Sequence, residues 1–84
     1  MSKNDNGKFD RDPGTVVYSW GRKSGERVFV SRSKAYGNRI HIREWLLNDK
    51  GAYYPTRAGI TLSLSEVRKL RRALEKACEM YELD

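Results

Sequence analysis

The chain has 84 residues, of which 33% are charged, and a formal net charge of +6. A chain of this length forms one small domain and buries only about 60–65% of its unfolded surface, so pairing with a second copy is a natural source of further apolar burial. The single cysteine, Cys78, excludes a disulfide within the chain and favours a reducing compartment, either the cytoplasm with its nucleoid or a eukaryotic nucleus. No apolar run approaches the roughly 20 residues of a membrane span, so we expect neither a membrane segment nor a signal peptide.

All of the excess positive charge lies in the middle of the chain. Residues 1–14 carry three basic and three acidic side chains, and residues 64–84 carry five of each, whereas residues 15–63 carry nine basic and three acidic ones. Seven of the nine aromatic residues lie in the same middle segment. Basic residues interleaved with aromatic ones are typical of nucleic-acid-binding surfaces. The alternative, a small domain with ordinary surface charge and an aromatic core, does not explain this segregation.

The chain begins with a polar segment that precedes the domain. Residues 1–14 end in Asp-Pro-Gly, a turn-prone tripeptide, which predicts a flexible arm before a domain of residues 15–84. β-Branched and aromatic residues then alternate over Thr15–Trp20 and again over Glu26–Ser33. These patterns predict two strands joined as a hairpin by a basic, glycine-bounded loop.

The stretch Arg39–Leu47 forms the centre of the predicted sheet. Strict alternation places Ile40 and Ile42 on one face. The other face carries two guanidinium groups, an imidazole and an indole, from Arg39, Arg43, His41 and Trp45. Guanidinium groups bind phosphates and an indole stacks on bases, so the stretch predicts the central strand of a sheet that binds single-stranded nucleic acid.

The segment after this strand is less regular. Residues 48–51 are typical of a turn. Residues 52–55 leave the next element open, because Pro55 cannot donate a hydrogen bond and any strand here would be short, bent or at an edge. Ile60–Leu62 then predicts a short fourth strand.

A capping box introduces the last element. The Ser63 hydroxyl and the Glu66 carboxylate can each accept a hydrogen bond from the other residue's amide, which predicts a helix from Leu64 to about Tyr81. Its apolar residues recur at spacings of three and four, a narrow seam of coiled-coil type made by Val67, Leu70, Leu74, Ala77 and Tyr81. With one helix in each chain, we expect a homodimer with these five residues at its interface. The alternative is a monomer whose helix lies on its own sheet.

Three stretches together resemble the transcriptional positive cofactor four family: Arg39–Trp45, the turn with Asp49 and Gly51, and residues 55–62. The resemblance covers about residues 15–80 and is best over 40–70. It implies an α+β fold, a curved four-stranded antiparallel β-sheet followed by one C-terminal α-helix (ββββα) that dimerises through the helix. It also implies binding of single-stranded or melted DNA with little sequence preference, in transcription regulation or in replication and repair. No serine-rich acidic arm of the eukaryotic type is present, so we expect a compact bacterial or phage-type member.

The resemblance also assigns individual positions. Arg43 and Arg57 match cations of the family motif, whereas Leu46 stands where the family has a second, stacking aromatic residue and Ala58 where it has a second cation. We expect these two departures to shift binding toward neighbouring aromatic and basic residues. The candidate nucleic-acid-binding residues are therefore Arg22, Lys23, Arg32, Lys34, Arg39, Arg43, Trp45, Tyr54 and Arg57.

Catalysis, a metal site and a cofactor are not expected. His41 is the only histidine and Cys78 the only cysteine, so neither a Cys–His pair nor a set of metal ligands is available. Glu44 lies on the aliphatic side of its strand, where we expect an arginine partner rather than a role as a base. The leading hypothesis is a dimeric protein that binds single-stranded DNA, with transcription or replication proteins as further partners. Two alternatives remain: an RNA-binding protein or RNA chaperone, and a module whose basic sheet binds acidic segments of the transcription machinery.

Overall fold

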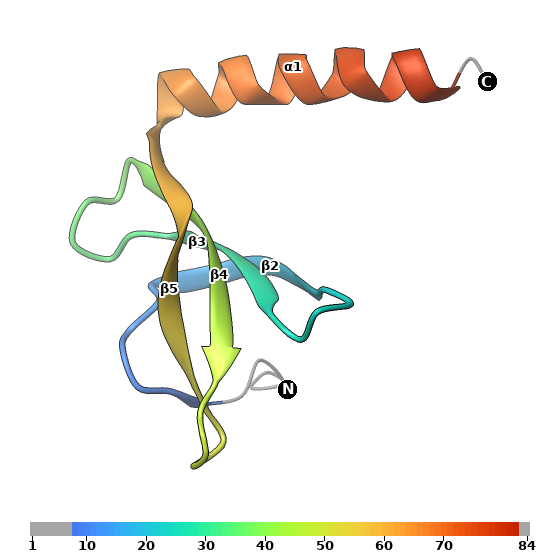
Figure 1. Ribbon diagram of the computed structural model, residues 1–84. Helices are drawn as coiled ribbons and strands as arrows, with labels where there is room; N and C mark the ends of the chain where they lie inside the picture. The colour runs from blue at the N-terminus through green and yellow to red at the C-terminus, as the bar shows by residue number, and fades with distance from the viewer. Residues whose placement is uncertain (1–7, 83–84) are drawn as a thin grey trace.

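The structure is a computed structural model that describes residues 8–82. Its elements are β1 (Lys8–Phe9), β2 (Thr15–Gly21), β3 (Arg27–Arg32), β4 (Arg39–Leu47), β5 (Ala52–Ser63) and α1 (Leu64–Glu82) (Figure 1). The strands form one curled sheet in the order β1-β5-β4-β3-β2. Strands β2 to β5 pair antiparallel, and β1 pairs parallel to β5. The fold is therefore α+β, a mixed five-stranded sheet with one C-terminal helix.

Strand β1 is a correction to the predicted four-stranded antiparallel sheet. Phe9 is the only aromatic residue among the first 14. Its ring packs against those of Phe29, Trp45 and Tyr53, with centroid distances of 5.1, 5.2 and 5.8 Å. Burial of this one ring holds β1 in register with the start of β5. The overall polarity of the segment does not indicate this packing, because a single side chain makes it.

Strand β5 is continuous over 12 residues, where the sequence left residues 52–55 open and predicted a short strand at Ile60–Leu62. Pro55 lies beyond the two residues of β5 that pair with β1, beside a shift in the register between β4 and β5. A sheet accepts proline at an open edge or at a bulge, and both conditions hold here. Gly59 lies opposite Arg43, where the two backbones approach so closely that a Cβ atom would lie 2.7 Å from the carbonyl oxygen of Ile42.

The two faces of the sheet bury different side chains. Cross-strand pairing places Phe29 and Trp45 on one face, which we call the aromatic face, and Val28, Ile42 and Leu62 on the other, the aliphatic face. Phe29 and Trp45 are buried, as are Val28 and Leu62. The alternation predicted for the central strand is confirmed, because its isoleucines lie on the aliphatic face and its arginines on the aromatic face.

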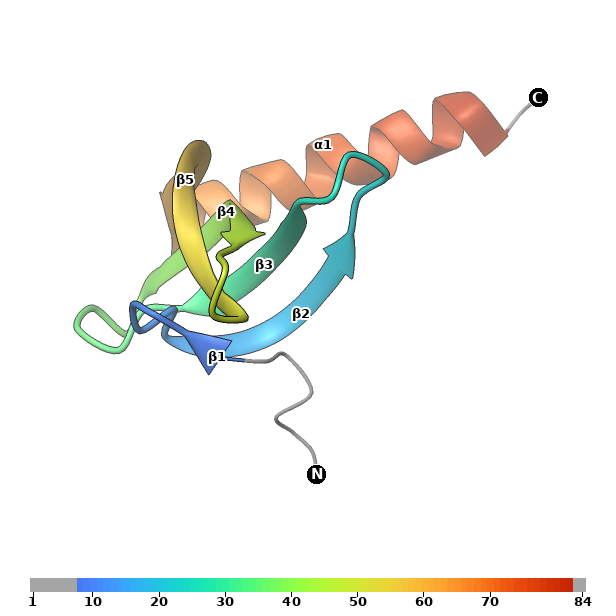
Figure 2. The same ribbon diagram turned by 60° about the horizontal axis from the view of Figure 1, so that its bottom comes forward.

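Helix α1 begins at the predicted capping box. The Ser63 amide donates to Oε1 of Glu66 at 3.0 Å, and the Glu66 amide donates to Oγ of Ser63 at 3.3 Å. The helix then projects beyond the sheet, at the opposite end of β5 from β1 (Figures 1 and 2). Val67 and Leu70 are half-buried, whereas Leu74 is 55% exposed. Within residues 8–82, no helix is long and apolar enough to cross a membrane.

Candidate nucleic-acid interface

Arg43 lies half-buried at the centre of the aromatic face. Its Nη1 donates a hydrogen bond to the carbonyl oxygen of Thr56 at 2.8 Å. The hydroxyl of Thr56 in turn donates to the carbonyl oxygen of Glu44 at 2.9 Å. A guanidinium group carries five N–H donors, so this bond orients the side chain and leaves the other donors for a ligand.

A row of polar side chains crosses β3, β4 and β5 beside Arg43. Ser31 pairs with His41, and His41 pairs with Thr61. Nδ1 of His41 lies 2.8 Å from Oγ1 of Thr61. This row, Arg43 and residues of the N-terminal segment surround a cavity of about 220 Å³, which is lined by Arg11, Asp12, Pro13, Ser31, His41, Arg43, Trp45, Pro55 and Thr61.

Residues 10–14, which we call the strap, run along the aromatic face from β1 to β2 and form one wall of this cavity. They are the described end of the arm that the sequence predicts to be flexible; residues 1–7 lie outside the described residues. Asp12 of the strap forms an ion pair with Lys34 at 3.3 Å and accepts a hydrogen bond from the Gly14 amide at 2.9 Å. This amide, helped by Lys34, holds the pKa of Asp12 below its usual value.

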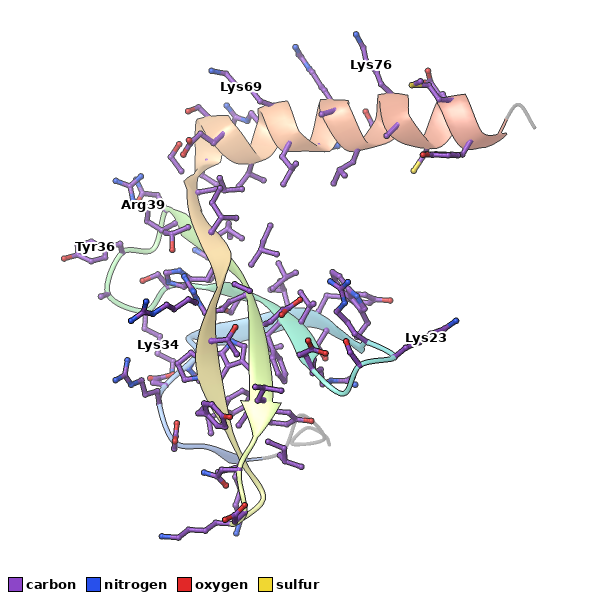
Figure 3. All side chains as sticks on the ribbon, viewed as in Figure 1. Lys23, Lys34, Tyr36, Arg39, Lys69 and Lys76 are labelled. Atoms are coloured by element: carbon purple, nitrogen blue, oxygen red, sulfur yellow. The ribbon has the colours of Figure 1, made fainter. Side chains whose placement is uncertain are left out.

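The predicted cations do not form one patch. Lys34 and Arg39 lie beside the β3–β4 loop together with Tyr36, whereas Lys23 projects from the β2–β3 loop on the opposite side of the molecule (Figure 3). Lys69 and Lys76 of α1 point away from the sheet (Figure 3). Lys34 and Arg39 therefore lie far from Lys23, and the positive charge of the middle segment is not gathered in one place (Figure 3).

Some of the predicted cations are also engaged within the chain. Arg22 forms an ion pair with Glu44 at 3.2 Å, which confirms the arginine partner expected for this glutamate. Arg32 donates to the carbonyl oxygen of Gly37 at 3.2 Å. Among the described residues, Lys23 and Arg57 form no ion pair, so these exposed cations are available to a ligand.

Trp45 is not the exposed stacking platform that the sequence predicted. Its side chain is 6% exposed, and its ring lies edge-on to those of Phe9 and Phe29, at interplanar angles of 89° and 80°. The alternation placed it on the correct face, but the contact with β1 turns that end of the face into core. Tyr36 of the β3–β4 loop, 68% exposed, is an open aromatic ring beside predicted cations (Figure 3). The predicted Tyr54 is 37% exposed, but it pairs with Leu46 and so lies on the aliphatic face.

Tyr36, Arg11, Ser31 and Thr61 are residues of this region that sequence reasoning did not assign to the site. The sequence does indicate an exposed ring at Tyr36, because an aromatic residue inside a short basic turn has no strand or helix face to pack on. Arg11 is one of three cations of the N-terminal arm that could contact nucleic acid, but no sequence pattern separates it from Lys3 and Lys8, since its position over the aromatic face depends on the packing of Phe9.

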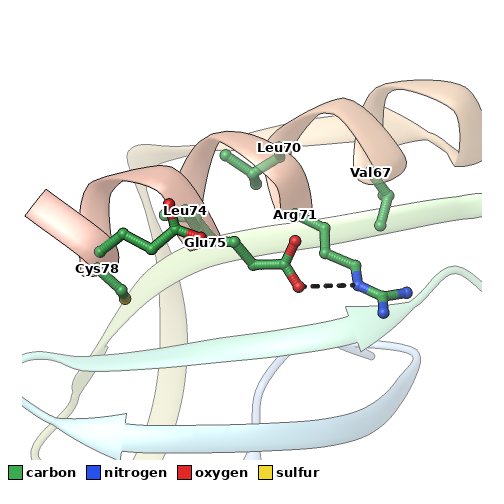
Figure 4. Close-up of a pocket in the computed structure, with 7 residues that line it drawn as sticks. Val67, Leu70, Arg71, Leu74, Glu75 and Cys78 are labelled. Atoms are coloured by element: carbon green, nitrogen blue, oxygen red, sulfur yellow. Dashed lines mark ion pairs between the residues drawn. The ribbon is translucent and has the colours of Figure 1, made fainter.

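The predicted dimer residues divide into two groups. Val67, Leu70 and Leu74 line an open apolar groove along α1 of about 710 Å³, together with Cys78 (Figure 4). An ion pair between Arg71 and Glu75, at 3.7 Å, lies in the same groove (Figure 4). The other two predicted residues, Ala77 and Tyr81, are exposed and do not line it.

The family model of Transcriptional Coactivator p15 (PC4) matches residues 20–73, more than half of the chain. The chain belongs to the PC4 family. The resemblance to the positive cofactor four family is thereby confirmed. Comparisons with curated proteins and with solved structures gave no significant match.

The family match divides this PC4 domain into elements that the family model covers and elements that lie outside it. It includes β3, β4, β5 and the first half of α1, and with them Arg43, Arg57 and Gly59. The PC4 family consists of DNA-binding transcriptional coactivators. The strap lies outside the matched residues, so the cavity combines a shared sheet with a wall from the chain's own N-terminal segment.

Proposed function

We propose that this PC4 protein binds single-stranded DNA along the aromatic face of its sheet, with little sequence preference, in transcription regulation or in replication and repair. The observation that carries the proposal is Arg43, a half-buried guanidinium group fixed by the carbonyl oxygen of Thr56 in the middle of a curved face. Arginine in such a setting suits phosphate oxygens, which accept hydrogen bonds from its planar fork.

The exposed ring of Tyr36 favours single strands over duplex. Tyr36 lies beside Lys34 and Arg39, so a base stacked on this ring would leave its phosphate near two cations (Figure 3). Such stacking is worth about 1–3 kcal/mol per base and requires bases that are not stacked in a duplex.

The test is fluorescence anisotropy of oligo(dT), a single-stranded RNA of equal length and a DNA duplex over a series of salt concentrations. We expect oligo(dT) to bind far more tightly than duplex, and Arg43→Ala to reduce the salt slope by about 0.7 for each phosphate that the variant no longer neutralises. Lys69→Ala is the matched control, because it removes one charge that points away from the sheet (Figure 3). Equal affinity for duplex, or no binding at low salt, would contradict the proposal. Tighter binding of RNA would favour the RNA-binding alternative instead.

We also propose that the protein acts as a homodimer. Two apolar surfaces of the chain stay uncovered: the groove along α1, and the exposed part of the aliphatic face, where Trp20 is 43% and Ile60 is 53% exposed. Large exposed apolar patches mark interaction surfaces, and a twofold dimer can cover both surfaces with one contact.

Sedimentation or light scattering tests the dimer. We expect the wild type to sediment as a dimer and Leu74→Asp to sediment as a monomer, because the carboxylate would be buried in the apolar groove. Arg72→Asp, on the opposite side of the helix, is the control and should leave the dimer intact although it changes the charge more. A monomeric wild type would refute the proposal.

A further inference from the structure

The cavity beneath the strap has the composition of a phosphate site. We propose that it binds one phosphate group of a single-stranded DNA ligand, held between the strap and the polar row of the sheet. This inference rests on the proposed function and assigns one part of it. It also goes beyond the PC4 match, because Arg11 and Pro13, which close the cavity, lie outside residues 20–73.

Two guanidinium groups from distant parts of the chain meet at this cavity. Arg11 comes from the strap and Arg43 from β4, and both line it. One N–H of Arg43 is occupied by the carbonyl oxygen of Thr56. Phosphate oxygens accept paired hydrogen bonds from such planar groups, so two arginines can hold one phosphate from two sides.

The hydroxyl of Ser31 is an independent sign of a polar ligand. Ser31 lines the cavity and is 3% exposed. Among the residues that the structure describes, its hydroxyl has no hydrogen-bond partner. A buried polar group without a partner is uncommon and unfavourable, and a phosphate oxygen in the cavity would supply the missing bond.

The adjoining pair of His41 and Thr61 adds donors. The imidazole and the hydroxyl share one hydrogen bond at 2.8 Å. If Thr61 donates this bond to Nδ1, the other ring nitrogen of His41 carries a proton. If His41 donates it, the hydroxyl proton of Thr61 becomes free. In both arrangements the pair retains a donor that an anion can use.

The charges around the cavity favour an anion. Asp12 is the one carboxylate among the lining residues, and it is engaged by Lys34 and the Gly14 amide. Arg11 and Arg43 therefore determine the sign of the charge that a ligand meets. Trp45, Pro13 and Pro55 form the apolar remainder of the wall, and apolar atoms beside a charged contact lower the local dielectric constant and strengthen it.

The experiment compares two oligo(dT) molecules with a 3′ label, one with a 5′-phosphate and one with a 5′-hydroxyl, by fluorescence anisotropy. Arg11→Gln should weaken binding at least about fivefold, and Ser31→Ala at least about threefold, since each removes a hydrogen bond to a charged group. Lys8→Gln is the matched control: it removes the same charge from the same segment, does not line the cavity, and should weaken binding at most about twofold.

The two oligonucleotides distinguish the sources of the phosphate. A loss confined to the 5′-phosphorylated oligonucleotide would assign the cavity to a terminal phosphate, and an equal loss for both would assign it to a phosphate within the strand. If the wild type binds but Arg11→Gln equals Lys8→Gln and Ser31→Ala equals the wild type, the cavity is not a phosphate site, while single-strand binding stands. If the wild type binds neither oligonucleotide, the proposed function fails and this inference fails with it.

Discussion

Replacing Gly59 by alanine is the smallest change that acts directly on the position of Arg43. A Cβ atom at Gly59 would lie 2.7 Å from the carbonyl oxygen of Ile42 and 2.8 Å from both Cα and Cβ of Arg43. Distances below 3.0 Å are essentially not seen for Cβ atoms. Two of the three atoms belong to the backbone of β4, so no side chain can rotate away. Strands β4 and β5 must therefore separate at Arg43.

The expected loss of stability follows from these close distances. Overpacking of a well-packed site costs typically about 1–3 kcal/mol, and we expect about 2 kcal/mol because the atoms that would clash cannot move independently. With a urea dependence of about 1–2 kcal/mol per molar for a small domain, the unfolding midpoint should fall by about 1–2 M. Fluorescence of the buried Trp45 reports the transition. The displaced guanidinium group should also weaken binding of oligo(dT).

Gly37→Ala is the control for this experiment. A Cβ atom at Gly37 would meet only Nη2 of Arg32, at 4.0 Å, so the free energy of unfolding should change by less than about 0.5 kcal/mol. Both variants are measured at one protein concentration, because a dimer would make stability depend on it. Equal midpoints for Gly59→Ala and Gly37→Ala would show that the sheet relaxes freely, and would refute the close approach as the reason for glycine.

Three further predictions concern the ends of the fold. Phe9→Ala should lower the free energy of unfolding, measured in urea, by about 2–3 kcal/mol, because it removes a half-buried ring with three aromatic neighbours. A change below about 0.5 kcal/mol would show that this ring does not anchor β1. Asp12→Asn should tighten oligo(dT) binding about two- to threefold, because it frees Lys34 from its ion pair. Asp10→Asn is the control, since it changes the charge equally but breaks no ion pair among the described residues, and it should have a smaller effect. Equal effects of the two variants would leave only net charge as the cause. Hydrogen bonds from the capping Ser63 hold the pKa of Glu66 below its ordinary value of 4.5, so the ionised carboxylate stabilises the fold above that pH and this stabilisation is lost as the pH falls through the lowered pKa. The difference in stability between wild type and Glu66→Gln should therefore shrink between pH 6 and pH 3. A difference that stays constant over this range would contradict the cap.

The features that could be predicted from the sequence depend on neighbouring residues in the chain. The alternation in Arg39–Leu47 determined the faces of β4 correctly, because successive side chains of a strand point in opposite directions. The capping box predicted the start of α1, since Ser63 and Glu66 satisfy each other within one turn. Both patterns involve only interactions that are local in the sequence.

The features that were missed depend on packing between distant residues. Strand β1 exists because Phe9 reaches an aromatic cluster some 20 to 44 residues away, and the same packing buries Trp45. Pro55 is accepted because the partner strand ends before it, which a single segment does not reveal. In the site, the sequence identified the cations but not that Lys34 pairs with Asp12, because the two residues meet only once the strap lies on the sheet.

The strap adds little to binding through its net charge, because Arg11 lies between two aspartates. Its contribution must come from short-range interactions in the cavity. Arg11, Lys23 and Arg57 are all exposed and all subject to screening over about 8 Å at physiological salt, but only Arg11 lines the cavity, where it can also hold a phosphate by hydrogen bonds. Arg11→Gln, like Arg43→Ala, should reduce the salt slope by about 0.7. Part of its loss of affinity should nevertheless remain at high salt, because hydrogen bonds to the phosphate are lost as well, whereas the effects of Lys23→Gln and Arg57→Gln should disappear. If none of the three variants shows a remaining loss of affinity at high salt, the strap acts as one more surface charge and not as the wall of a site.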